Sequence, residues 1–185
     1  MPRRPHALVA PLLVLAMVGC TPTTVLPPAS PPSEEAPLFA SDEEALAAAT
    51  EAYEEFLAVS SQILQEGGRD PERLLPLVSD EVYETELEGF TEVDSRDLSV
   101  SGSSIATDTQ LQQHISGAAG LAEVIIYVCV DVSATNVSDS NGTSLVDPDR
   151  PSHLAFEAGF ASDQDGQLTL NSKSIWETES VCGDS

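Results

Sequence analysis

The spacing of the apolar residues changes at Phe90, and this change limits the folds open to the chain. Before Phe90, apolar side chains recur every three or four residues, as they do along one face of a helix. After Phe90 they alternate with polar residues, as they do in a strand with one buried face. Helices followed by strands, without alternation between the two, predict an α+β fold.

Three helices are predicted in the first half of the body. The first runs from Ser41 to Gly67, because Ser41 and Glu44 have the spacing of a capping box and glycine is a common helix stop. A short second helix is predicted from Pro71, and a third after Ser79. We expect the long first helix to cover the apolar face of the sheet.

The second half predicts an antiparallel meander. Its strongest strand carries an apolar row at every second position, with Val128 near the middle. A hairpin turn is predicted at Asn141-Gly142. Strands are expected over residues 96–102, 107–115, 121–137, 152–162 and 168–182.

The N-terminus carries the pattern of an export signal. Two arginines precede a short apolar run that ends at Val18, and Gly19 then precedes Cys20. This arrangement resembles a bacterial lipobox, although Met17 stands where that pattern prefers leucine. The resemblance implies cleavage before Cys20 and lipidation of its thiol, which would anchor the protein to the cell membrane, facing outside the cytoplasm. An ordinary signal peptide with a chance cysteine is the alternative.

Three segments follow from this interpretation. Residues 1–19 form a lipoprotein signal peptide, and residues 20–40 form a lipidated cysteine with a proline-rich disordered linker. Residues 41–185 form one α+β domain. The linker would act as a spacer of up to about 60 Å, with a proline-rich ligand for a partner domain as the alternative.

The remaining two cysteines and the charge restrict the environment and the partners. With Cys20 lipidated, an exported protein retains Cys129 and Cys182, which predicts a disulfide between them. The formal net charge is −24, and all 31 acidic residues follow Cys20. Such a chain repels nucleic acid, so we expect no nucleic-acid partner.

Catalytic and metal-binding patterns are missing from the sequence. The segment "DQDG" lacks the ligand spacing of a calcium loop, and there is no nucleophile elbow, phosphate loop or zinc motif. Strict alternation puts His114 in phase with Gln110 and Gln112, away from the apolar positions. We therefore predict no catalytic residue, no metal site and no cofactor.

The order of helix, short helix, short helix and curved antiparallel sheet resembles the nuclear transport factor 2-like fold, also called the cystatin-like α+β cone. The segments "VCVDVSATNVSDSNG", "DRPSHLAFEAGFA" and "SIWETESVC" resemble secreted lipoproteins of high-GC Gram-positive bacteria. The resemblance covers residues 41–182. It implies a cone whose lining would include Tyr53, Phe56, Val128 and Trp176, with ordinary core packing as the other interpretation.

Two functions remain open at this stage. The first is a lipid-anchored, non-catalytic binding or assembly module of the cell envelope. Its partner would be an unknown protein or a small apolar ligand, and a homodimer through the sheet is a specific version. The alternative is an isomerase-like or dehydratase-like enzyme acting on a small apolar substrate inside the cone.

Overall fold

The computed structural model describes residues 36–117, 121–177 and 181–183. The predicted signal peptide, the lipidation site Cys20 and the linker as far as residue 35 lie outside these residues. All the elements described below belong to one compact unit. Within the described ranges, no helix combines the length and apolar character that a membrane span requires.

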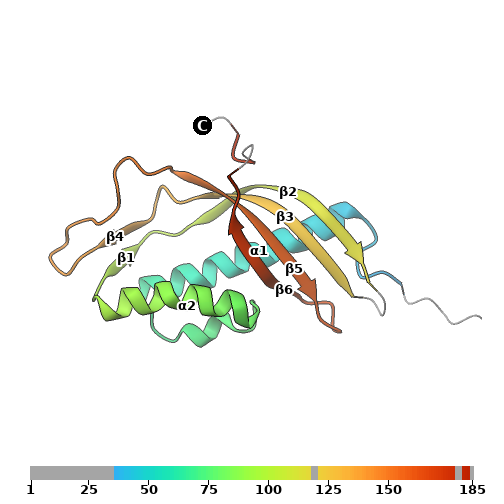
Figure 1. Ribbon diagram of the computed structural model, residues 1–185, viewed down its shortest axis with the longest axis horizontal. Helices are drawn as coiled ribbons and strands as arrows, with labels where there is room; N and C mark the ends of the chain where they lie inside the picture. Colours follow the sequence, from blue (N-terminus) through green and yellow to red (C-terminus); the bar gives the residue numbers. More distant parts are fainter. Residues whose placement is uncertain (1–35, 118–120, 178–180, 184–185) are drawn as a thin grey trace, which may run out of the picture. The chain divides into compact units, whose positions relative to one another are not determined.

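The body is an α+β domain, as predicted, with its helices before its strands (Figure 1). The helices are α1 (Asp42–Gln65), a 3-10 turn η1 (Pro71–Leu74) and α2 (Asp80–Ser95). The strands are β1 (Ser99–Ser101), β2 (Ile105–Ser116), β3 (Ala122–Asp131), β4 (Asn136–Ser138), β5 (His153–Ser162) and β6 (Leu168–Ile175).

The prediction of three helices was wrong, because the second is only a 3-10 turn. Asp70 has a left-handed backbone with φ 53° and gives η1 no side-chain cap. Pro76 cannot donate a backbone hydrogen bond, so the turn cannot grow into an α-helix. The described body therefore contains two α-helices.

The start of α1 follows the predicted capping box. The Ser41 hydroxyl accepts a hydrogen bond from the Glu44 amide at 3.2 Å. The Glu44 carboxylate in turn accepts one from the Ala40 amide at 2.7 Å. Phe39, which the sequence places in the linker, is buried in the same hydrophobic core as the helix, so the packed body begins before Ser41.

Four strands form an antiparallel meander in the order β2-β3-β5-β6 (Figure 1). The predicted single strand over 121–137 is instead divided into β3 and β4. A turn between them, in which the Thr135 amide donates to the Val132 carbonyl at 3.0 Å, redirects the chain. As a result β4 pairs with β1 in a separate two-stranded ribbon.

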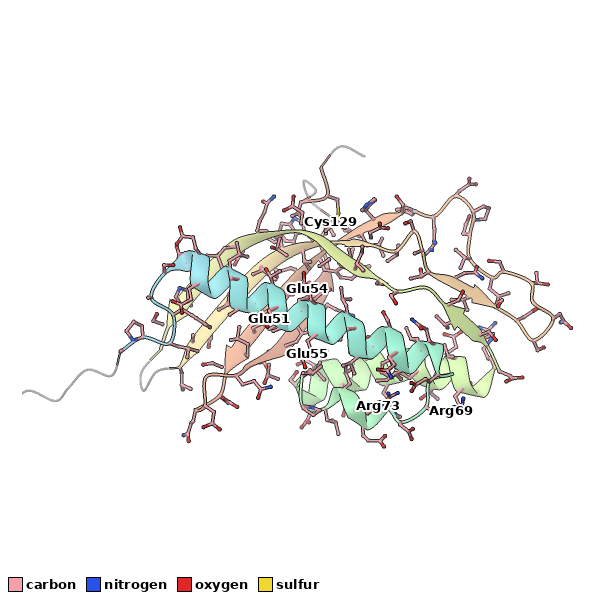
Figure 2. All side chains as sticks on the ribbon, turned by 180° about the vertical axis from the view of Figure 1, so that it is seen from behind. Glu51, Glu54, Glu55, Arg69, Arg73 and Cys129 are labelled. Carbon is pink, nitrogen blue, oxygen red and sulfur yellow. A yellow bond between two sulfur atoms is a disulfide. The ribbon has the colours of Figure 1, made fainter. Side chains whose placement is uncertain are left out.

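One face of the sheet packs against the helices, and it holds the core of the domain. The even-numbered residues of β3 face this side, and Val124, Ile126 and Val128 are completely buried. Tyr53 and Phe56 of α1 belong to the same hydrophobic cluster. Figure 2 shows α1 lying across this face in front of the sheet. We call it the inner face and the opposite side the outer face.

Three β-bulges interrupt the alternation of the edge strands. The extra residues are Thr107 and Gln112 in β2 and Asn171 in β6. A bulge places two residues on one strand opposite one on its neighbour, so the face on which later side chains lie is shifted by one position. Because of these shifts, strict alternation assigns several residues of β2 and β6 to the wrong face.

Candidate functional site

The predicted cone interior is filled by side chains. Tyr53, Phe56 and Val128 are each at most 1 % exposed, and the two aromatic rings lie 5.5 Å apart. Phe90 of α2 and Leu170 of β6 are buried in the same cluster. These residues form the core of the domain, so three of the four predicted lining residues pack against one another.

The fourth predicted lining residue, Trp176, does not join them. Its ring centroid lies 4.5 Å from that of Tyr127. Tyr127 alternates with the buried Val128 along β3 and so lies on the outer face. The bulge at Asn171 shifts the phase of β6 by one residue, so Trp176 falls opposite Ala155 on the outer face and not in line with Leu168 and Leu170.

The predicted disulfide is present, and it also lies on the outer face. Cys129 in β3 is bonded to Cys182, and their Cα atoms are 4.9 Å apart. Cys129 is almost completely buried, as is the neighbouring Val181 of the C-terminal segment. The bond therefore holds this segment against the middle of the sheet.

A charged pair stands at the border between α2 and β6. The bulge at Asn171 brings Lys173 opposite Ala158, a core residue, and so turns Lys173 toward the inner face. Its ammonium group forms a salt bridge with Glu86 of α2. It also lies 4.9 Å from the centre of the Phe56 ring, a favourable cation–π contact.

The surroundings of this pair form a small hollow of about 250 Å³, lined by residues of α2 and by 171–174 of β6. The buried Tyr53 lies close enough to Glu86 for their charges to interact. Burial, together with the Glu86 charge, raises the pKa of Tyr53. At neutral pH Tyr53 is protonated and Lys173 is paired, so neither is poised as a general base.

A second bulge changes the position predicted for His114. The extra residue Gln112 places His114 opposite Val124, on the inner face, although strict alternation assigns it to the other side. Its ring lies edge-on to Phe39 at 5.7 Å. Its Nδ1 is 3.2 Å from an Asp42 carboxylate oxygen. Its side chain is 8 % exposed, so this base lies beneath the start of α1.

A groove between α1 and β2 lies at the surface next to the core. Two hollows of about 430 and 230 Å³ adjoin, and both are lined by Glu54 and Ala106. We call them together the α1–β2 groove. Its lining comprises Thr50, Glu54, Leu57, Ala58, Gln62 and Gln65 of α1 and residues 103–109 before and within β2.

Polar bridges join the two walls near each end of the groove. The Thr50 hydroxyl donates to the Thr109 hydroxyl at 3.0 Å. The Gln65 amide donates to the Gly102 carbonyl at 2.9 Å and to the Ser103 hydroxyl at 3.0 Å. Between these bridges, no hydrogen bond crosses from α1 to residues 104–108 in the described structure. The groove is therefore fixed at its ends and open along its middle.

Acidic side chains lie in and beside the groove. Glu54 lines both hollows. Glu51 and Glu55 project from the same stretch of α1 in Figure 2, and neither lines a hollow of the groove. Asp108 borders the second hollow on the β2 side, and its place opposite Cys129 is on the outer face. Neither α1 nor β2 contains a lysine or an arginine. No salt bridge is formed by these four carboxylates within the described residues.

The five basic side chains after Cys20 are used elsewhere. Lys173 binds Glu86, and Arg96 binds Glu92 of its own helix. The other three donate hydrogen bonds that fix local backbone: Arg69 to the Glu66 carbonyl, Arg73 to the Asp70 carbonyl and Arg150 to the Val132 and Thr135 carbonyls. Figure 2 shows Arg69 and Arg73 together at the far end of α1 from its acidic middle.

No group of three metal-ligating side chains comes together among the described residues. On the outer face, Asp131 accepts a hydrogen bond from its own loop at the Ser133 amide. Hydrogen bonds from Ser133 hold the pKa of Asp131 below its usual value.

Comparison with known proteins identifies no family for the chain. No family model matches it, and no curated protein matches it. The intermembrane space region of the chloroplast protein ARC6 matches with a TM-score of 0.50 at 11 % identity, over 70 % of this chain and 95 % of that one. At this identity the match concerns the arrangement of helices and sheet alone.

Two further solved structures resemble the chain more distantly. A periplasmic fragment of TraM has a TM-score of 0.45 and 14 % identity, over 74 % of this chain and 98 % of that one. A de novo designed β-sheet protein has a TM-score of 0.31 and 14 % identity, over 75 % of this chain and 95 % of that one.

Proposed function

We propose that the chain is a lipid-anchored, extracytoplasmic binding or assembly module of the cell envelope, without a catalytic role. The observation that carries this proposal is the filled space between the helices and the inner face. A small apolar substrate has no cavity to enter there, because Tyr53, Phe56 and Val128 occupy it. The hollows described above open at the surface, where a partner protein has direct access.

Two features support a location outside the cytoplasm. Disulfides persist in oxidising compartments, and Cys129 is bonded to Cys182. The lipobox-like segment before Cys20 supplies the second feature, since two or more acyl chains hold a protein stably at a membrane. Membership of the nuclear transport factor 2-like lipoproteins is part of the same proposal and rests on the sequence patterns.

The enzyme alternative is less well supported by the geometry. The ionisable groups nearest the core are the Lys173–Glu86 pair, the protonated Tyr53 and His114. Lys173 and Glu86 neutralise each other, and His114 is covered by Phe39. A homodimer through the sheet is also less favoured, since the C-terminal segment occupies part of the outer face and both copies would be strongly acidic.

The anchor is tested by replacing Cys20 with alanine. We expect the full chain to partition with membranes and to incorporate labelled palmitate, and the Cys20→Ala variant to lose both properties. Thr21→Ala, which changes the neighbouring residue and keeps the thiol, serves as the matched control and should behave as the wild type. Retention of Cys20→Ala in the membrane fraction would refute the lipid anchor.

A further inference from the structure

We infer that the α1–β2 groove is the docking site for an extended, basic segment of a partner protein. This inference rests on the binding function proposed above and specifies the chemistry of the partner. Four properties of the groove carry it: its length, the free edge of its strand, its charge and its partly apolar wall.

The two walls of the groove have matching lengths. From Thr50 to Gln65, α1 advances about 22 Å at 1.5 Å per residue. On the other wall, residues 103–109 span about 20 Å when extended. An extended segment of about six residues therefore has the length of the groove.

The strand wall of the groove has a free backbone edge. Within the described residues, β2 pairs only with β3, so its other edge presents unpaired amides and carbonyls. The opposite edge of the sheet is partly closed by the chain itself. There, Leu170 of β6 exchanges backbone hydrogen bonds with Leu77 and Ser79, each at 2.9 Å.

The bulges at Thr107 and Gln112 limit how a new strand could pair with β2. Regular pairing is possible over the short run between them, residues 108–111. Short pairing gives little affinity, so side-chain contacts must supply the rest. We therefore expect strand addition without matching side-chain contacts to be weak at this edge.

The charge of the groove selects a basic partner. Glu54 on α1 and Asp108 on β2 border the groove, Glu51 and Glu55 lie on the neighbouring part of α1, and none of the four has a cationic partner among the described residues. The five cations of the body are used elsewhere, so the chain cannot neutralise this surface itself. Lysine or arginine side chains of a partner would do so, and they would also accelerate association by electrostatic steering.

The apolar part of the groove wall requires apolar side chains in the partner as well as cations. Leu57 is half-buried in the groove, and Ile105 is 55 % exposed at its mouth. In an extended segment, successive side chains point to opposite sides. A segment that alternates basic and apolar residues could therefore place its cations near Glu54 and its apolar side chains on Leu57 and Ile105.

Two other occupants fit less well. The chain's own linker, residues 21–40, contains no lysine or arginine and contributes Glu34 and Glu35. A second copy of the chain would bring its own Asp108 and Glu54 to the same edge, where like charges repel. If either one occupied the groove, peptide binding in the test below would not depend on basic residues.

The test uses the purified full chain and capped peptides of about ten residues, long enough to span the groove. The probe alternates lysine and valine and carries a fluorophore. Control peptides alternate glutamate and valine, or lysine and serine. Fluorescence anisotropy gives the dissociation constants, and hydrogen–deuterium exchange locates the binding site. We expect the lysine–valine peptide to bind most tightly and to slow exchange at residues 103–111.

Two matched variants separate the groove from general acidity. Glu54→Lys and Glu84→Lys change the net charge equally, but Glu84 lies on the exposed side of α2. We expect Glu54→Lys to weaken binding by about tenfold or more and Glu84→Lys by less than about twofold. Equal weakening by both variants would overturn the inference, as would protection from exchange elsewhere or equal binding of the lysine–serine peptide.

The two proposals fail in different ways. If the peptide experiment refuted the groove inference, the membrane fractionation of Cys20→Ala would be unchanged. The protein would then bind its partner through another surface. Failure of the anchor leaves the peptide measurements unchanged, because they do not depend on a membrane.

Discussion

Two residues of opposite charge lie at the border of the core. Lys173 and Glu86 form a salt bridge in which the two side chains are 20 % and 15 % exposed. A pair this far removed from water is costly to break on one side only, because the remaining charge stays in a poorly solvated position. Removing one partner should therefore lower the free energy of unfolding, which can be measured.

We expect Lys173→Met to lower the free energy of unfolding by about 1–3 kcal/mol, since it leaves the Glu86 carboxylate without its partner. Adding Glu86→Gln should recover part of this loss, giving a positive coupling in a double-mutant cycle measured by urea unfolding. The exposed Arg96–Glu92 pair supplies the control, and Glu92→Gln should cost less than about 0.5 kcal/mol. Strict additivity of the two changes would contradict the pairing.

Tyr53 makes stability depend on alkaline pH. Burial and the Glu86 charge raise the pKa of Tyr53 above its usual value of about 10. The unfolded chain therefore loses the Tyr53 proton first, so this contribution to stability is complete below about pH 10 and declines above it. Urea unfolding at successive alkaline pH values should show a decline of up to about 1.4 kcal/mol per pH unit from this residue, and Tyr53→Phe should remove that part. An unchanged slope in the variant would argue against the buried hydroxyl.

At the scale of elements, the joint between α1 and α2 depends on one close approach. Gly68 has a φ of +75°, and a Cβ added there would lie 2.1 Å from the backbone oxygen of Phe90. Gly68 thus permits the end of α1 to contact α2. Side chains larger than hydrogen would push the two elements apart.

We expect Gly68→Ala to destabilise the domain by about 3 kcal/mol or more, since backbone strain and a clash with backbone act together. Gly142→Ala is the matched control. Gly142 has a φ of +81° but open space around the added Cβ, so this change should cost only about 1 kcal/mol. Thermal unfolding of the two variants measures the difference, and equal losses would show that the close approach is unimportant.

The sequence predicts elements well where their signals are local. The capping box at Ser41 set the start of α1, and the alternation of β3 identified the buried row around Val128. The bulges escaped prediction, because an extra residue has no local signature of its own. As a result His114 and Lys173 were missed on the inner face. The helix predicted from Pro71 was wrong for a different reason. A proline at the first position is typical of a helix start, whatever residues follow it.

For the candidate site, the sequence shows which side chains are acidic, basic or aromatic, but not which residues surround them in the fold. The acidic residues of α1 can be read from the sequence, but the groove beside them depends on how β2 lies against the helix. The disulfide could be predicted because only two cysteines remained once Cys20 was assigned to the lipid. Trp176 was misplaced because the bulge at Asn171 shifts the phase of the strand before it.

At the scale of the whole molecule, the disulfide closes two of the four strands of the main sheet into one loop. Cys129 and Cys182 are 53 residues apart, and the segment between them contains β4, β5 and β6. In the chain-entropy model, a crosslink over such a loop stabilises a domain by about 4 kcal/mol. It also fixes the segment after β6 against β3.

We expect reduction to lower the free energy of unfolding by about 2–4 kcal/mol in urea titrations. Cys182→Ser should match the reduced wild type and should not respond further to the reducing agent. Identical unfolding curves for the oxidised and reduced wild type would show that the bond adds no stability. Reductant sensitivity of Cys182→Ser would show that another thiol is responsible.

The bulge at Gln112 has a consequence for how this sequence can change length. Deleting Gln112 by an in-frame loss of one codon would remove the extra residue and leave Leu111, Gln113 and His114 in plain alternation opposite Ile126, Ile125 and Val124. His114 would keep its place beneath Phe39, and the 44 % exposed Ile115 would stay on the opposite face. The bulge is therefore a position where the strand can lose one residue without exchanging its inside and outside. Related chains should accordingly vary in length here while keeping the residues after the bulge on the same faces.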